Sequence, residues 1–429
     1  MARGCAIGRY LSDISSDPSI AAALAPVDRA ILTICANPDA DHAAILQSLS
    51  CEDWQVLADQ ADQMRIGPLI DRALKLAGTK VEVPAGARDT ISRAFKWHSI
   101  YALQQTTGLV RLATVLEKQG WSPVFLKGVS LALRDYPEPG LRPMRDVDLL
   151  LPPEEAANAQ AFLLDHEFYQ LAPWATDKTV EPAHHFWNLQ DVAMDLTIEV
   201  HHRLNATPLW QHEKKLIARI LASDTTMRVS AREIRVTDPV TNLLHLVEHA
   251  TLHHAFDNGP LILADLHYVV GRHEIDWPSL IAQARELDLL RPLQLIAEIA
   301  RTFGACWVPA DLPPREDLRQ AFLPAACRAM LQGDDLAQQG KMLRPVDPGS
   351  GKKGMWRDAL WRALHPDPRQ LALMAGVGEQ SAWRWLALPR WLVDRAGKYL
   401  AARRNLRDLL KDGALPELQG WLLGEGKKR

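Results

Sequence analysis

The chain has 429 residues, of which 47% are hydrophobic and 24% charged, with a formal net charge of -3. This length predicts several domains, and the near-neutral charge excludes a strong overall attraction to nucleic acid. Five cysteines without CxxC spacing indicate reduced thiols, and the sequence shows neither a signal peptide nor an apolar run of about 18 residues, so a cytoplasmic protein is expected.

The first part of the chain has the pattern of packed helices. Between residues 27 and 115, apolar residues recur at three- and four-residue spacing, and Gly78 stands where a helix would stop. The pattern predicts an N-terminal helical region over residues 1–118.

Strand-length apolar runs alternate with helix-like segments over residues 119–236. PVFL and VDLLL are predicted strands, VSLALRDY and PEEAANAQAFLLDH are predicted helices, and MDLTIEVHHRL is a further predicted strand. In that last strand, alternation places Asp195, Thr197, Glu199 and His201 on one face. The order predicts an α+β fold, with a small mixed sheet and helices packed on it.

The helical pattern returns after residue 237, with Asp238 or Thr241 as the expected cap of the first helix. The segment LRPVDPGSGKKG, residues 343–354, is rich in Pro, Gly and Lys and marks an exposed linker or mobile loop. We therefore expect one helical domain over 237–342 and a separate C-terminal helical region over 343–429.

Two aspartates, Asp146 and Asp148, open the predicted strand VDLLL. Side chains at i and i+2 of a strand point the same way, so these carboxylates share one face about 7 Å apart. A divalent cation such as Mg²⁺ would relieve their repulsion, and Glu199 on the later strand can supply the third carboxylate that two-ion phosphoryl transfer needs. The alternative is that so short a motif is only the polar start of an ordinary strand.

Positive and flexible residues surround this acidic motif. Lys127, Gly128 and Ser130 stand at a strand-to-helix turn, where the backbone can approach a phosphate, while Arg142 and Arg145 precede the aspartates. Each taken alone has an ordinary explanation, as a turn glycine or a surface cation. Their order along the chain is what one phosphate-binding site would need.

Three segments together carry a resemblance to a known family. FLKG, LRPMRDVDLLLP and IEVHHRL resemble an uncharacterised bacterial nucleotidyltransferase family of the polymerase-β-like superfamily, with motif-level similarity between residues 124 and 204. The resemblance implies a nucleotidyltransferase core flanked by N- and C-terminal helical regions. It also implies Mg²⁺ (or Mn²⁺)-dependent transfer of a nucleoside monophosphate from an NTP to an unknown acceptor, with release of pyrophosphate.

The resemblance assigns roles to individual residues. The catalytic, metal-binding carboxylates would be Asp146, Asp148 and Glu199. The nucleotide-binding residues would be Lys127, Gly128, Ser130, Arg142 and Arg145. Residues 237–342 would form the acceptor-side domain, and the expected acceptor-side residues are His201, His253 and Asp265.

Two departures from the family pattern concern the same residues. The chain has Glu199-Val200-His201-His202 where relatives more often have Asp-x-His-Trp, so the longer acid places an ion differently. It has Lys-Gly-Val-Ser in place of the Gly-Ser pair of the wider superfamily, which weakens the phosphate-binding assignment. Neither departure removes a required charge.

A second metal motif competes with the first. HLVEH, from His245 to His249, matches H-x-x-E-H, in which two histidines of a helix bind zinc and the glutamate acts as a base in metallopeptidases. No third zinc ligand is identifiable, so the alternative of a polar helix face near the cleft is favoured.

A basic, Trp-rich segment occupies residues 351–410, with twelve Lys or Arg against five acidic residues and five interleaved tryptophans. It indicates either the solvated face of a helical domain or contact with an anionic membrane surface or an acidic acceptor.

The expected partners are an NTP and a small-molecule, sugar, peptide or protein acceptor; nucleic acid is not expected. The other class of function is a catalytically inactive binding module, an accessory to envelope or polysaccharide synthesis at the membrane surface.

Overall fold

The computed structural model describes residues 24–166, 168–170, 184–205, 210–332, 368–378, 381–405 and 414–422. Its first part is helical, as the apolar periodicity predicts. Its helices are α2 (Pro26–Ala36), α3 (Ala43–Gln47), α4 (Cys51–Gln63), α5 (Gly67–Ala77), η1 (Gly78–Lys80) and α6 (Ala85–Lys118). The stop signal is confirmed, because α5 ends at Ala77 and Gly78 follows with a positive φ of 61°.

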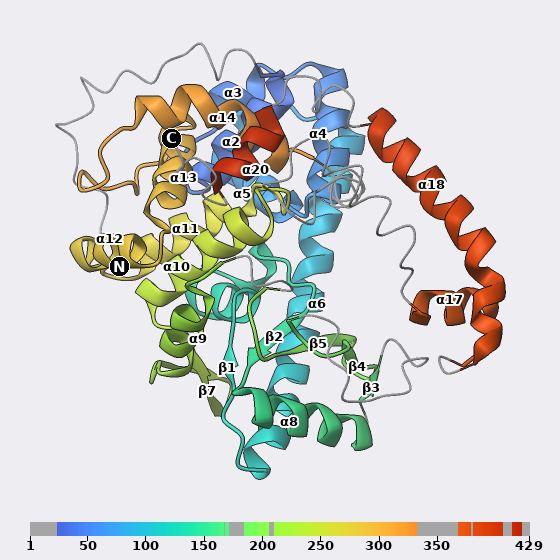
Figure 1. The fold of residues 1–429 in the computed structure, drawn as a ribbon. Helices are drawn as coiled ribbons and strands as arrows, with labels where there is room; N and C mark the ends of the chain where they lie inside the picture. Colours follow the sequence, from blue (N-terminus) through green and yellow to red (C-terminus); the bar gives the residue numbers. More distant parts are fainter. Residues whose placement is uncertain are drawn as a thin grey trace.

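Helix α6 connects the N-terminal helices to the sheet. Its 34 residues span about 51 Å at the usual rise per residue. The first half packs against α4 and α5, and the second half packs on the sheet through Leu109, Leu112 and Leu116 (Figure 1).

The central element is a mixed seven-stranded sheet with the order β3-β4-β5-β2-β1-β7-β6. Its strands are β1 (Val124–Phe125), β2 (Val147–Leu150), β3 (Tyr169–Gln170), β4 (Leu189–Asp191), β5 (Leu196–His201), β6 (Thr226–Val229) and β7 (Arg232–Val236). β2 pairs in parallel with β5 and β1 with β7, whereas the other pairs are antiparallel. This mixed sheet among helices confirms the α+β class.

The predicted strand and helix order is confirmed over the first half of the sheet. PVFL contains β1, VDLLL contains β2, and PEEAANAQAFLLDH forms α8 (Pro153–Asp165), which packs on the same sheet face as α6. VSLALRDY forms α7 (Gly128–Ser130) and one π-helical turn, η2 (Leu131–Asp135), followed by the short η3 (Pro139–Leu141). One detail differs, because Asp195 has a φ of 47° in the turn before β5 and does not belong to the strand.

Helices before and after the sheet share one hydrophobic core. The later helices are α9 (Glu213–Leu221), α10 (Pro239–Glu248), η4 (His249–His253), α11 (Leu261–Arg272), α12 (Trp277–Glu286), α13 (Leu290–Thr302) and α14 (Glu316–Met330). Asp238 caps α10 by accepting a hydrogen bond from the Thr241 amide. Helices α2, α4 and α5 contribute to the same core as α10, α11 and α13, so the two helical parts meet above the sheet. The division of the chain into four domains stays a prediction.

The described C-terminal segments are α17 (Pro368–Ala375), η6 (Ala382–Ala387), α18 (Leu388–Asn405) and α20 (Ala414–Leu422). α20 packs on α14, while α17, η6 and α18 form a small cluster of their own at the periphery (Figure 1). The predicted linker at 343–354 lies outside the described residues. Among the described residues, none of the helices combines the length and apolar content needed to cross a bilayer.

Gly108 sets how closely α6 approaches the turn before β5. A Cβ at this position would lie 2.9 Å from Met194 Cβ and 3.1 Å from Leu196 Cδ2. Gly108→Ala is therefore expected to lower the free energy of unfolding by about 1–3 kcal/mol in a denaturant titration. Gly86→Ala on the same helix is the control, because a Cβ there meets nothing within 4 Å and should raise stability by up to ~1 kcal/mol. Equal effects at both sites would contradict the close approach.

Candidate functional site

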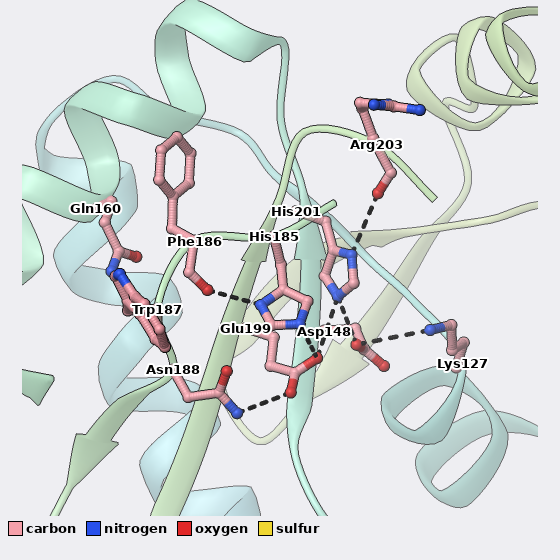
Figure 2. Close-up of polar contacts among 10 residues, drawn as sticks. All are labelled: Lys127, Asp148, Gln160, His185, Phe186, Trp187, Asn188, Glu199, His201 and Arg203. Atoms are coloured by element: carbon pink, nitrogen blue, oxygen red, sulfur yellow. Dashed lines mark hydrogen bonds and ion pairs between the residues drawn. The ribbon is translucent and has the colours of Figure 1, made fainter. Parts of the chain in front are cut away.

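The parallel pairing of β2 and β5 brings two acidic side chains together. The register places Asp148 directly opposite Glu199, although 50 residues separate them in the chain. Glu199 is oriented by Asn188, whose Nδ2 donates a 2.8 Å hydrogen bond to its Oε1 (Figure 2). Like charges held this close repel, so the pair requires a neighbouring cation.

His201, two residues after Glu199, is the first such cation. Its Nε2 lies 2.8 Å from Asp148 Oδ1 and 3.4 Å from Glu199 Oε2, and its Nδ1 lies 3.2 Å from the Arg203 carbonyl oxygen (Figure 2). Both ring nitrogens therefore face acceptors and act as donors, which describes an imidazolium. Burial lowers the pKa of His201, but the bonds to the two carboxylates outweigh it and raise that pKa above its ordinary value.

Lys127 supplies the second cation, with Nζ 3.7 Å from Asp148 Oδ1. Burial alone would raise the pKa of Asp148, but the charge of Lys127 and the hydrogen bond from His201 bring it well below the ordinary value. Lys127 is held with a φ of 41°, a conformation that a non-glycine residue adopts at a cost. The strained turn therefore places the Lys127 ammonium group beside Asp148 and Glu199.

Asp146 lies just before β2 and differs from its neighbour. Burial, together with the negative charges of Asp148 and Glu199, raises the pKa of Asp146 to about 7. Three carboxylates thus gather on one face of the sheet, on and beside its central strands β2 and β5, with Lys127 and His201 balancing only part of their charge.

The donor atoms around these carboxylates fit a divalent ion. Asp148, Glu199 and His201 each offer one ligand atom, and these atoms lie within 4.8 Å of one another. Carboxylate oxygens suit Mg²⁺ or Mn²⁺. His201 could add its Nε2 as a ligand only as a neutral imidazole, without the proton that it now gives to the carboxylates, and would then shift the preference towards transition metals. His201 thus lies with Asp148 and Glu199, and not on the acceptor side as its sequence position predicts.

The residues after Lys127 divide into one that reaches the cavity and one that does not. Gly128 lines the cavity, and a Cβ there would lie 3.4 Å from Arg142 Nη1. Ser130 is fully buried, and its hydroxyl donates a 3.1 Å hydrogen bond to the Lys127 carbonyl. In this structure the Ser130 side chain does not reach the cavity, contrary to the prediction that it contacts a triphosphate.

Arg142 and Asp265 form a single buried ion pair. Arg142 Nε and Nη2 each donate a 3.1 Å hydrogen bond to the Asp265 carboxylate, and the Tyr136 hydroxyl donates a third of 2.7 Å. The pair joins the loop before β2 to α11. Both residues line the cavity, and Asp265 neutralises the guanidinium that was expected to neutralise phosphate.

A cavity of about 320 Å³ lies over the three carboxylates. One wall comes from the sheet and its loops and includes Lys127, Gly128, Arg145, Asp146, Asp148 and Glu199. The opposite wall comes from the helices after the sheet and includes His249, His253, His254, Asp257 and Asn258. Arg65, in the turn between α4 and α5, adds a side chain from the N-terminal helices. The cavity therefore lies where all three parts of the chain meet.

Several cavity residues have no signal of their own in the sequence. His184 reaches the cavity from the loop before β4, and its ring lies 5.2 Å from that of His253 on the opposite wall. Arg65 has a φ of 57°, which only the folded turn reveals. The adjacent pair His184-His185 is the single sequence feature that could have drawn attention to this loop.

The H-x-x-E-H motif has a different environment. His249 lines the cavity, but His245 and Glu248 do not, and both are almost fully buried. Burial lowers the pKa of His245 to about 3 and raises that of Glu248 to about 7. Among the described residues, the group with metal-binding geometry is the acidic cluster, and it contains none of the three.

Comparison with known proteins gives one match. A family model described as "Uncharacterised nucleotidyltransferase" matches residues 50–304, a segment that contains the sheet, the three carboxylates and both walls of the cavity. None of the curated proteins and none of the solved structures compared with the chain matches it.

Proposed function

Since this chain belongs to the uncharacterised nucleotidyltransferase family, we propose that it transfers a nucleoside monophosphate from an NTP to an acceptor hydroxyl or phosphate, releasing pyrophosphate. The observation that carries the proposal is the register of β2 and β5, which sets Asp148 against Glu199 beside Asp146 on the wall of a cavity. Three carboxylates and a lysine around one space are what a metal-bound triphosphate requires.

In this proposal Asp146, Asp148 and Glu199 hold Mg²⁺ or Mn²⁺. Such an ion would neutralise charge on the triphosphate and lower the pKa of the acceptor hydroxyl. His201 positions Asp148, and Asn188 positions Glu199, through the hydrogen bonds described above. These two side chains fix the direction in which the carboxylate oxygens face the cavity.

The cationic residues of the same wall would bind the phosphates. Lys127 and Arg145 both line the cavity beside the carboxylates, and Gly128 leaves room there because it has no Cβ. Arg142 contributes mainly by holding the wall in place, because Asp265 already neutralises it. The acceptor would enter against the opposite wall, where His253 is fixed by a 3.0 Å hydrogen bond between its Nδ1 and Asn205 Oδ1.

Calorimetric titration with ATP, GTP, CTP and UTP, with and without Mg²⁺, tests the proposal. We expect Mg²⁺-dependent binding that the double variant Asp146→Asn, Asp148→Asn weakens by roughly 100-fold or more, since even outer-shell partners of a metal cost about 10–100-fold. The control is Glu154→Gln, Glu155→Gln, which removes the same charge from exposed positions at the start of α8. The base preferred then identifies the donor for assays of pyrophosphate release.

Two outcomes would overturn this proposal. If no nucleotide binds, or if both double variants bind as the wild type does, the aspartates are only the polar start of a strand. If a nucleotide binds but Mg²⁺ changes nothing and no pyrophosphate appears with any acceptor, the inactive binding module becomes the better description.

A further inference from the structure

The C-terminal helices η6 and α18 expose several large apolar side chains. Trp383 is 68% exposed, Val393 74% and Leu400 64%, with Trp385, Leu386 and Leu392 also exposed. We call these six residues the C-terminal apolar surface. Single exposed apolar residues are ordinary, but a group of this size with two tryptophans indicates a partner.

The exposed side chains lie next to a small core that is already packed. Trp391 is only 3% exposed and packs against Leu371 and Ala387, which form a small core between α17, η6 and α18. On α18, Leu392, Ala396 and Leu400 follow each other at four-residue spacing with Val393 beside them, and Trp391 lies on the opposite face. One face of α18 is therefore used for packing and the other is left in solvent.

Positive charge is concentrated in the same stretch of the sequence. Residues 381–405 contain six Lys or Arg against one acidic residue, although the whole chain has a net charge of -3. The Arg384 guanidinium lies 5.6 Å from the centre of the Trp385 ring, and Arg390 is exposed. Apolar side chains, tryptophans and arginines on one short helical unit are the combination found at the interface of an anionic bilayer.

We propose that the C-terminal apolar surface docks on an anionic phospholipid bilayer, with its apolar side chains at the depth of the headgroups and its arginines on the lipid phosphates. The contact is peripheral, because it uses one face of α18 lying along the surface. This membrane contact would determine where the protein acts, and it does not depend on the proposed nucleotidyl transfer. α18 lies at the outer edge of the molecule, away from the packed helices (Figure 1).

Flotation of the full-length protein with vesicles tests the proposal. We expect the protein to float with an equimolar mixture of phosphatidylcholine and phosphatidylglycerol, weakly with phosphatidylcholine alone, and less as salt is added. The triple variant Leu392→Gln, Val393→Gln, Leu400→Gln keeps every charge and should weaken partitioning by roughly tenfold or more. Its positions are exposed, so the fold is not at risk.

The chain offers a matched control on α6. Trp97, Ile100 and Leu103 are 65%, 65% and 71% exposed, and changing all three to Gln should leave flotation unchanged. Absence of flotation with anionic vesicles would overturn the proposal, as would an equal loss in both triple variants. Binding to single-stranded RNA with none to vesicles would assign the basic surface to nucleic acid instead. Nucleotide titration of the α18 variant should match the wild type, which separates this result from any failure of the proposed catalysis.

Discussion

Asp265→Asn is expected to lower the free energy of unfolding by about 3–5 kcal/mol, because it leaves a buried guanidinium without its anion. The side chains of Arg142 and Asp265 are 16% and 4% exposed, and two hydrogen bonds of 3.1 Å join them. Burial by itself would lower the pKa of Arg142, but Asp265 outweighs it and raises that pKa above its ordinary value. Asparagine keeps the shape of the side chain and removes only the charge. Urea titration followed by circular dichroism measures the effect.

Two further variants show whether the loss comes from the buried charge. Arg142→Met combined with Asp265→Leu removes both ions and should recover most of the stability, since apolar side chains can replace a buried ion pair at little cost. Glu117→Gln breaks the exposed pair that Glu117 makes with Arg232 and should change stability little. A loss at Asp265 no larger than that at Glu117 would show that the ion pair does not hold α11 to the sheet.

Much of the fold could be predicted because its signals are local. Apolar periodicity identified the helices before and after the sheet, and the runs PVFL and VDLLL identified β1 and β2. Four strands were not predicted. β3 has only two residues and β4 three, too few for alternation to show, and β6 and β7 mix charged residues with apolar ones along an edge of the sheet.

The site divides in the same way between local and long-range information. Asp146 and Asp148 are recognisable in the sequence because the strand period of two places them on one face. Glu199 is recognisable because it lies in the next long strand that the sequence predicts. Nothing local shows that Ser130 turns towards the Lys127 carbonyl or that Asp265 takes the charge of Arg142. Those contacts depend on how the loop before β2 meets α11, and the sequence does not encode that distance in any pattern of spacing.

Replacing the buried Glu248 is expected to raise the free energy of unfolding, whereas replacing Asp265 lowers it. Glu248 is buried on α10, accepts one hydrogen bond of 2.9 Å from Asn205 Nδ2, and its Oε2 has no partner. Burial, with a smaller contribution from the charge of Glu213, raises the pKa of Glu248 from 4.5 to about 7. Below pH 4.5 the Glu248 carboxyl is protonated in both the folded and the unfolded protein, so it does not lower the free energy of unfolding. As pH rises towards 7, only the unfolded chain ionises and stability falls, by about 3 kcal/mol in total.

Glu248→Gln should therefore raise the free energy of unfolding above pH 7 by up to about 3 kcal/mol and leave it unchanged below pH 4.5. Thermal unfolding across this pH range measures the difference. Glutamine can still accept the hydrogen bond from Asn205, although its buried NH₂ group reduces the gain.

Glu213 provides the matched control, because it is also buried but well partnered. Its carboxylate accepts hydrogen bonds from the backbone amides of Leu204 and Asn205, at 3.0 and 2.8 Å, and from Arg203. Glu213→Gln should lower stability at neutral pH, where Glu248→Gln raises it. A loss of stability in both variants would mean that Glu248 is held as a carboxylate. That result would contradict the raised pKa of Glu248, whereas opposite signs in the two variants would support it.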